Sequence, residues 1–179
     1  MPIFLQIDFN HVIKDLIFFI QPKSHIQYGE YFNWTGKMKY LPVELNGISQ
    51  TTLWDLEPEK HLLNKARMLF NGSERIEWRD NKYFYFLQNH ENYKNSLETY
   101  VYVYSFNIHP NKDSNFSGCN FSRLSDAQLQ VVLQNNNFIV DTNPIKTYPL
   151  YESAILKCYA TNYNTLVIKN GICGLKFSS

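Results

Sequence analysis

Short runs of apolar residues, separated by polar turns, follow one another along almost the whole of this chain. In the clearest run, YVYVYSFNI at 100–108, Tyr or Phe stands at every second position from Tyr100 to Phe106, and Val101 and Val103 lie between them. Because side chains alternate between the two faces of a strand, this run predicts a strand that is buried on both faces. Comparable runs lie at 3–9, 12–20, 66–70, 83–87, 127–133, 154–160, 165–169 and 173–177.

The turns between these runs carry hairpin signals. Asn-Gly pairs stand at 46–47, 71–72 and 170–171, and this dipeptide favours the tight turns of β-hairpins. One stretch, DLEPEKHLLNK at 55–65, is typical of a short helix, with Asp55 as its N-cap. Strands at this spacing predict an all-β fold, an antiparallel sandwich or jelly roll with one short helix.

Length and charge narrow the class of protein. The 179 residues suffice for one domain with a core of its own. The net charge is +1, from 17 basic and 16 acidic residues spread along the chain, so no basic stripe indicates a nucleic-acid partner. The run LIFFI at 16–20 is too short to span a bilayer. Three widely spaced cysteines suit free thiols in a reducing compartment.

Cys119, in the stretch SGCNFSRLSDAQLQVVL at 117–133, raises the question of catalysis. A nucleophilic thiolate needs a histidine or a helix N-terminus to lower its pKa. The residues that follow Cys119 alternate like a strand, which favours a turn that leads into a strand, with a cysteine hydrolase as the alternative. The chain contains no H-x-H, H-E-x-x-H or C-x-x-C motif, so we expect no enzyme, no metal and no cofactor.

Aromatic side chains offer a second alternative, a carbohydrate-binding β-sandwich. Such a module would stack sugars on exposed rings, and Trp34, Trp54 and Trp78 are the candidates. Tyr and Phe at every second position are more often core residues, because they pack one sheet of a sandwich against the other.

Several residues of the 117–133 stretch have a structural interpretation. Gly118 gives a turn its backbone freedom. Asn120 and Ser122 can bond nearby backbone and fix the entry to the strand. Arg123 is either an anchor for a neighbouring carboxylate or carbonyl, or an exposed charge that contributes little.

The same stretch resembles the signature segment of the double jelly-roll major capsid proteins of nucleocytoplasmic large DNA viruses. In that family a Ser-Gly turn and an Asn-Phe-Ser-Arg segment lead into a strand of alternating apolar residues. The match runs through Ser117, Gly118, Asn120, Phe121, Ser122, Arg123, Leu124, Asp126 and Leu129.

Four further blocks resemble the family in the same order along the chain. They are IDFNHVIKDLIFFIQ with Asn10 and His11, ARMLFNGSERIEWRDNKYF with Asn71 and Gly72, YVYSFNIHP at 102–110, and ATNYNTLVIKNGICGLKFSS with Asn162, Tyr163, Asn164, Gly171 and Gly174. Val12 stands where the family usually has Pro. Five blocks in order make the resemblance specific.

The resemblance implies a structural protein of an icosahedral virion, assembled in the host cytoplasm and built from trimeric capsomers. All five blocks belong to the second, C-terminal jelly roll, so residues 1–179 are expected to form that one domain without its opening strand. The expected partners are other copies of the chain, other capsid proteins and upstream jelly-roll sequence. The alternative within this class is a minor capsid or penton-like protein with a single jelly roll, which would fold alone.

Overall fold

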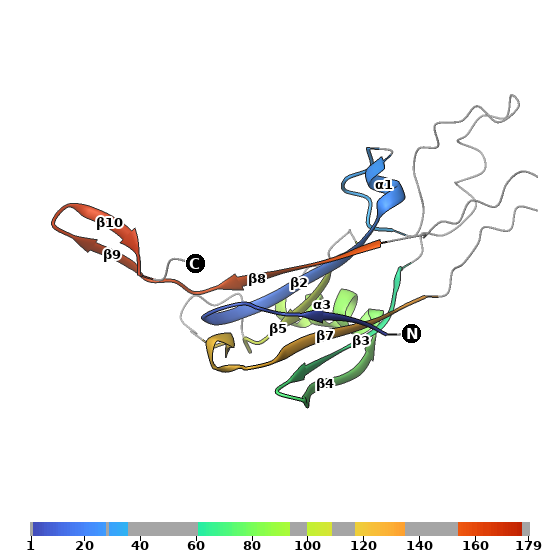
Figure 1. Ribbon diagram of the computed structural model, residues 1–179, viewed down its shortest axis with the longest axis horizontal. Helices are drawn as coiled ribbons and strands as arrows, with labels where there is room; N and C mark the ends of the chain where they lie inside the picture. The colour runs from blue at the N-terminus through green and yellow to red at the C-terminus, as the bar shows by residue number, and fades with distance from the viewer. Residues whose placement is uncertain are drawn as a thin grey trace, which may run out of the picture.

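The computed structural model describes residues 2–27, 29–35, 61–93, 100–108, 117–134 and 154–176. Two antiparallel sheets lie against each other in this part of the chain (Figure 1). Sheet A has the strand order β1 (Ile3–Gln6), β7 (Ala127–Leu133), β3 (Leu63–Phe70), β4 (Ser73–Asp80). Sheet B contains β2 (Val12–Pro22), β5 (Tyr102–Ser105), β6 (Cys119–Asn120) and β8 (Ala154–Asn162). A separate hairpin consists of β9 (Leu166–Lys169) and β10 (Ile172–Leu175). The expected antiparallel sandwich is confirmed.

Strand β2 is the centre of sheet B. Ile17 pairs with Val103 of β5 and also with Tyr159 of β8, so β5 and β8 lie on opposite edges of β2. Ile13 pairs with both β6 and β8, which places β6 on the same edge as β5. The eleven residues of β2 therefore hold two short strands on one edge and one long strand on the other.

The core lies between the two sheets. From β2 the side chains of Leu16, Phe18 and Ile20 enter it, and each is at most 2% exposed. The ring of Phe18 stacks on Tyr102 of β5 at 5.4 Å and meets Phe84 edge-on at 5.5 Å. Val101, Tyr102, Val103 and Tyr104 are all buried, which confirms that this strand is covered on both faces.

The Asn-Gly turns form as the sequence predicts. Between β3 and β4 the φ angles are 49° at Asn71 and 79° at Gly72, and between β9 and β10 they are 53° at Asn170 and 77° at Gly171. Positive φ at both central residues is the geometry that matches the twist of a two-residue hairpin. The pair at 46–47 lies outside the described residues.

The expected strand at 83–87 is wrong. These residues form the π-helix η1 (Tyr83–Leu87), which continues into α3 (Gln88–Tyr93). The Asp80 carboxylate accepts a hydrogen bond from the Tyr83 backbone N–H at 3.0 Å and so supports the first helical turn. Within η1 only Phe84 is buried. A short apolar run such as 83–87 fits a helix as well as a strand, so its sequence does not decide between them.

Other boundaries differ from the expectation as well. Of the helix expected at 55–65, residues 55–60 lie outside the described residues and 63–65 belong to β3. Strand β4 was not anticipated, and the run at 100–108 yields a strand only at Tyr102–Ser105. A short helix, α1 (Lys23–Gln27), follows β2. Among the described helices none has the length and apolar character to cross a membrane.

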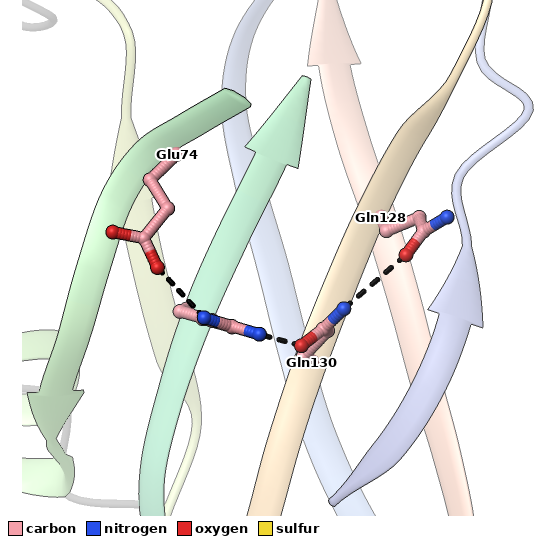
Figure 2. A network of polar contacts seen from close by, with 4 residues as sticks. Glu74, Gln128 and Gln130 are labelled. Carbon is pink, nitrogen blue, oxygen red and sulfur yellow. Dashed lines mark hydrogen bonds and ion pairs between the residues drawn. The ribbon is translucent and has the colours of Figure 1, made fainter. Parts of the chain in front are cut away.

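The outer face of sheet A carries a row of hydrogen-bonded polar side chains (Figure 2). Arg67 of β3 pairs with Glu74 of β4 at 2.7 Å and donates from Nε to Gln130 of β7 at 2.8 Å. Gln130 then donates to Gln128 at 3.2 Å. Gln130 is 4% exposed, and burial of an amide is tolerated only where its polar atoms are bonded. The row therefore fixes the side chains of this face across three strands.

Replacing Phe18 by Ala tests the core. We expect the free energy of unfolding to fall by about 3–5 kcal/mol, because a fully buried ring leaves a cavity between the sheets. Chemical denaturation measures this loss. Phe32→Ala, at a ring that is 84% exposed, is the matched control and should change stability by less than about 0.5 kcal/mol. Equal effects of the two substitutions would contradict the assigned core.

Candidate functional site

The turn at 117–123 packs directly against the first residues of β2. Asn120 and Cys119 of β6 pair with Val12 and Ile13. A Cβ atom added to Gly118 would lie 2.5 Å from the Ile13 carbonyl oxygen and 2.9 Å from Val12 Cγ1. No side chain fits in that space, so the close approach of the two backbones requires glycine at 118.

Two turns, one at His11 and one at Phe121–Arg123, are hydrogen-bonded to each other at the start of β2. Residues Phe121–Arg123 form a 3₁₀ turn, η2, whose N-cap is Asn120: its side-chain Oδ1 accepts from the Ser122 N–H at 3.1 Å. His11 has a φ of 68°. Its carbonyl accepts from the Phe121 N–H at 2.9 Å, and its own N–H donates to Ser122 Oγ at 2.8 Å. These reciprocal bonds attach η2 to the entry of β2.

The ring of Phe121 anchors the turn in the core. It is 3% exposed and meets Phe70 edge-on at 5.3 Å and Phe106 at 5.6 Å, with Phe9 at 6.4 Å. Edge-to-face aromatic pairs add to the stabilisation that burial of the rings supplies. Phe121 therefore connects the turn to β3, to the end of β5 and to the segment before β2.

Asn71 attaches the β3–β4 hairpin to the segment that follows η2. Its side-chain oxygen accepts hydrogen bonds from the backbone N–H of Ser125 at 3.0 Å, from Ser125 Oγ at 2.9 Å and from the Asp126 N–H at 3.0 Å. Its own backbone N–H donates to the Asp126 carbonyl at 2.7 Å. Asn71 thus adopts the positive φ that its turn requires and also holds the segment that leads into β7.

A third contact brings in the segment after β8. The Tyr163 N–H donates to the Val12 carbonyl at 3.2 Å. The Tyr163 hydroxyl accepts from Asn107 Nδ2 at 3.0 Å, and Ser117 Oγ donates to Asn107 Oδ1. We call this set of contacts around the start of β2, made by His11, Asn71, Asn107, Ser117–Asp126 and Tyr163, the β2 junction.

The family described as large eukaryotic DNA virus major capsid protein matches residues 4–174. The chain belongs to this family. The major capsid protein of Chrysochromulina ericina virus is 35% identical to it over 114 residues, which are 64% of this chain and 18% of that protein. The major capsid protein of Paramecium bursaria Chlorella virus 1 is 29% identical over 127 residues, 66% of this chain and 29% of that protein.

Solved capsid structures share the fold. The quasi-atomic model of the PBCV-1 virus capsid matches with a TM-score of 0.73 and 23% identity, covering 100% of this chain and 46% of that chain. The Faustovirus major capsid protein matches with a TM-score of 0.55 and 9% identity, over 89% of this chain and 31% of that chain. The two sheets are therefore those of a capsid jelly roll. The chain spans about a fifth of the length of the first curated relatives it matches.

The β2 junction brings together most of the residues that carry the likeness to the capsid family. His11, Gly118, Asn120, Phe121 and Ser122 lie in it, as do Asn71 and Tyr163, and Asn162 pairs with Ile13 at its edge. Gly72 lies in the adjoining turn. Asn10 is exposed, Asn164 accepts from the next backbone N–H at 2.8 Å, and Gly171 and Gly174 lie in the β9–β10 hairpin.

Arg123 is exposed, and its guanidinium has no ion pair within the described ranges. The interpretation as an exposed charge therefore fits better than the interpretation as an anchor. Cys119 lies in the same turn and is half-buried, and burial raises the pKa of its thiol. A raised pKa is the opposite of what an activated nucleophile requires.

Sequence reasoning missed two polar contacts of the capsid fold. Asn107 links Ser117 to Tyr163, and nothing in the sequence around it indicated this role. Asp15 is 3% exposed in the middle of β2 and accepts from Thr161 Oγ1 of β8 at 2.9 Å. A lone carboxylate inside the apolar run at 12–20 was a signal that could have identified Asp15, because buried carboxylates require hydrogen-bond donors.

The described tryptophan rings are not the freely exposed rings that a sugar-binding surface requires. Trp78 is half-buried, with Lys65 Nζ at 5.2 Å and the Arg67 guanidinium at 4.8 Å from its ring centre. Trp34 is half-buried against Phe19 at 4.7 Å, and Trp54 lies outside the described residues. The cations over Trp78 occupy positions that a stacked sugar would need.

Gly118→Ala tests the close approach to β2. We expect a loss of about 1–3 kcal/mol in the free energy of unfolding, because the new methyl group meets the Ile13 carbonyl and must displace backbone. Gly174→Ala is the matched control, since a Cβ there meets nothing within 4 Å. Urea denaturation should show the control unchanged or more stable by up to about 1 kcal/mol. A Gly118→Ala chain as stable as the control would refute the contact.

Asn71→Gly tests the hydrogen bonds that attach the β3–β4 hairpin. Glycine keeps the positive φ but removes the shared acceptor, so we expect a loss of about 1–2 kcal/mol from the groups left unpaired at Ser125 and Asp126. Asn170→Gly makes the same change in the β9–β10 turn, where the described residues show no such bonds to another segment. The two variants are compared by thermal unfolding, and equal stabilities would contradict the assigned role of Asn71.

Proposed function

We propose that this chain is a structural component of an icosahedral viral capsid, built into the shell as part of a trimeric capsomer. The observation that carries the proposal is the family match over residues 4–174. The β2 junction supports it, because the residues that carry the family likeness serve packing and turn geometry. On this proposal the chain acts in the virion after assembly in the host cytoplasm, with no catalysis, no cofactor and no nucleic-acid partner.

We further propose that residues 1–179 correspond to the second jelly roll of a capsid protein without its opening strand. Sheet A is four strands wide, whereas sheet B is three strands wide where β5, β2 and β8 lie side by side. Within the described residues the edge of β8 that faces away from β2 has no pairing strand. An unpaired edge of nine residues invites a strand from another segment. Upstream jelly-roll sequence of the same capsid protein is the proposed partner.

A minor capsid or penton-like protein with a single jelly roll is the alternative within the capsid class. It predicts that the 179-residue chain folds and remains soluble by itself. The unpaired edge of β8 favours the first proposal, since an eight-stranded jelly roll has a fourth strand in its second sheet, and that strand would pair with β8.

Co-expression tests the proposal. We expect the chain to co-purify with the first jelly roll of a family member, because that partner supplies the strand for β8. We expect light scattering to give a mass of three such pairs. An unrelated β-sandwich, expressed in the same way, is the control and should not co-purify. A chain that is a stable monomer alone and binds neither the first jelly roll nor the control would overturn the proposal.

A further inference from the structure

The two sides of the sandwich differ in how they are covered. On one side η1 contacts β4 of sheet A and β5 of sheet B, and its Phe84 is fully buried. Strands β1 and β8 lie at the other edges of the two sheets, so they border the opposite side. In the described part of the chain β1 pairs with β7 alone and β8 pairs with β2 alone.

The inward side chains of β1 are incompletely covered. Ile3 pairs with Val131, and Leu5 pairs with Leu129. Val131 and Leu129 are fully buried, and directly paired residues point to the same face of a sheet, so Ile3 and Leu5 point into the sandwich. Ile3 is nevertheless 44% exposed. Its side chain therefore lacks an apolar neighbour on the β8 side.

Strand β8 shows the same incomplete cover on the facing sheet. Its side chains Leu156, Cys158 and Ala160 pack against the core but are only half-buried. Because side chains alternate, Lys157 and Tyr159 lie on the outer face of sheet B. We call the side of the sandwich that carries these half-covered apolar residues the open edge; its residues are Ile3, Leu5, Leu156, Cys158 and Ala160.

The chemistry of the open edge fits an extended strand. An edge strand presents unpaired backbone N–H and C=O groups, which a further strand satisfies by adding to the sheet. In such a strand every second residue points between the sheets and has to be apolar, whereas the residues between them lie beside Lys157 and Tyr159 and can be polar. The open edge therefore selects a strand with one apolar and one polar face.

A second copy of β8 fits this place less well. Pairing two copies of β8 would bring Cys158 and Ala160 of each chain to the same face, and such small side chains would leave Ile3 exposed. Small residues on one strand are filled best by large residues on its neighbour. The open edge thus favours a strand with large apolar residues, such as leucine, on its inward face.

The direction of the strands indicates which segment supplies this strand. Every described strand pair is antiparallel, and a strand antiparallel to β8 finishes beside Ala154, which pairs with Pro22 at the end of β2. Strand β1 leads toward the start of β2, so its own first residue, Ile3, lies toward that same end. Sequence that directly precedes β1 in a longer capsid polypeptide therefore reaches β1 by a short connection. The matched PBCV-1 capsid chain is such a longer chain, since 46% of it is covered.

We propose that the open edge binds the amphipathic strand that directly precedes β1 in the capsid polypeptide, antiparallel to β8 and with its apolar face between the sheets. The inference rests on the proposed second jelly roll and specifies its partner by direction and by side-chain pattern. The apolar residues of this strand cover Ile3 and Leu5 and pack beside Cys158 and Ala160.

Two synthetic peptides test the side-chain pattern. Each carries a segment of nine residues, the length of β8, between terminal lysines. In one peptide leucine and threonine alternate, and in the other the same residues are arranged with all leucines in one block. We expect the full chain to bind the alternating peptide at least about tenfold more tightly, because only alternation lets the backbone pair while every leucine enters the core. Fluorescence anisotropy measures both affinities, and equal affinities would overturn the proposal.

Ile3→Asp and Phe4→Asp form a matched pair that tests the surface. Both change an exposed apolar residue of β1, at 44% and 59% exposure, but Phe4 pairs with Gln130 and so lies on the outer face. Ile3→Asp should weaken binding of the alternating peptide at least about tenfold, because its carboxylate would be buried between the sheets. Phe4→Asp should leave binding unchanged. Circular dichroism, expected to be the same for both variants, shows that lost binding does not come from lost folding. Equal binding by the two variants would contradict the assigned surface.

Amide hydrogen exchange shows where the peptide binds. With the alternating peptide bound, every second amide of β8, those that face away from β2, should exchange at least about tenfold more slowly. The amide of Gly171 in the β9–β10 turn is the control and should be unaffected. Bound peptide without slower exchange in β8 would overturn the proposed place of binding.

The outcomes separate this inference from the proposed function. A chain that co-purifies with the first jelly roll but does not discriminate between the peptides overturns the strand site and leaves the capsid proposal standing. A chain that binds the alternating peptide at β8 but does not co-purify with the first jelly roll overturns the proposed capsid partner and leaves the strand site standing.

Discussion

The backbone of β2 is bonded along both of its edges, and the rest of the sandwich depends on that strand. One edge receives β8 over nearly its whole length, and the other receives β5 and then β6. Where β6 arrives, the backbones of Gly118 and Ile13 come so close that no side chain fits between them. The carbonyl of Val12 also accepts the Tyr163 N–H. The residues that carry the family likeness are largely those at which another segment meets β2.

Local patterns in the sequence predicted most of the sheet framework. The strands around 12–20, 66–70, 127–133 and 154–160 formed because alternation places their apolar residues in one core. The Asn-Gly turns formed because their geometry depends on two residues alone. The helix at Tyr83–Leu87 was missed because its apolar run fits either period. The helical form is supported by a hydrogen bond from the Tyr83 N–H to the Asp80 carboxylate, which lies outside the run.

Most residues of the candidate site were predictable from the sequence, but their contacts were not. Gly118 and Asn71 could be singled out from turn chemistry and from the family likeness. Their partners, Ile13 and Ser125, lie far away in the sequence, and no local pattern encodes that proximity. Asn107 was missed for the same reason.

The central claim is that the turns of the β2 junction are attached to the sandwich. Amide hydrogen exchange at these turns tests it most directly. The N–H groups of His11, Asn71 and Phe121 lie in turns, yet each donates to a segment distant in sequence. If these turns are attached to the sandwich, their amides will exchange as slowly as those in the middle of β2, and the amide of Gly171 in the projecting hairpin will exchange fast. Exchange of His11, Asn71 and Phe121 at the rate of Gly171 would contradict the account.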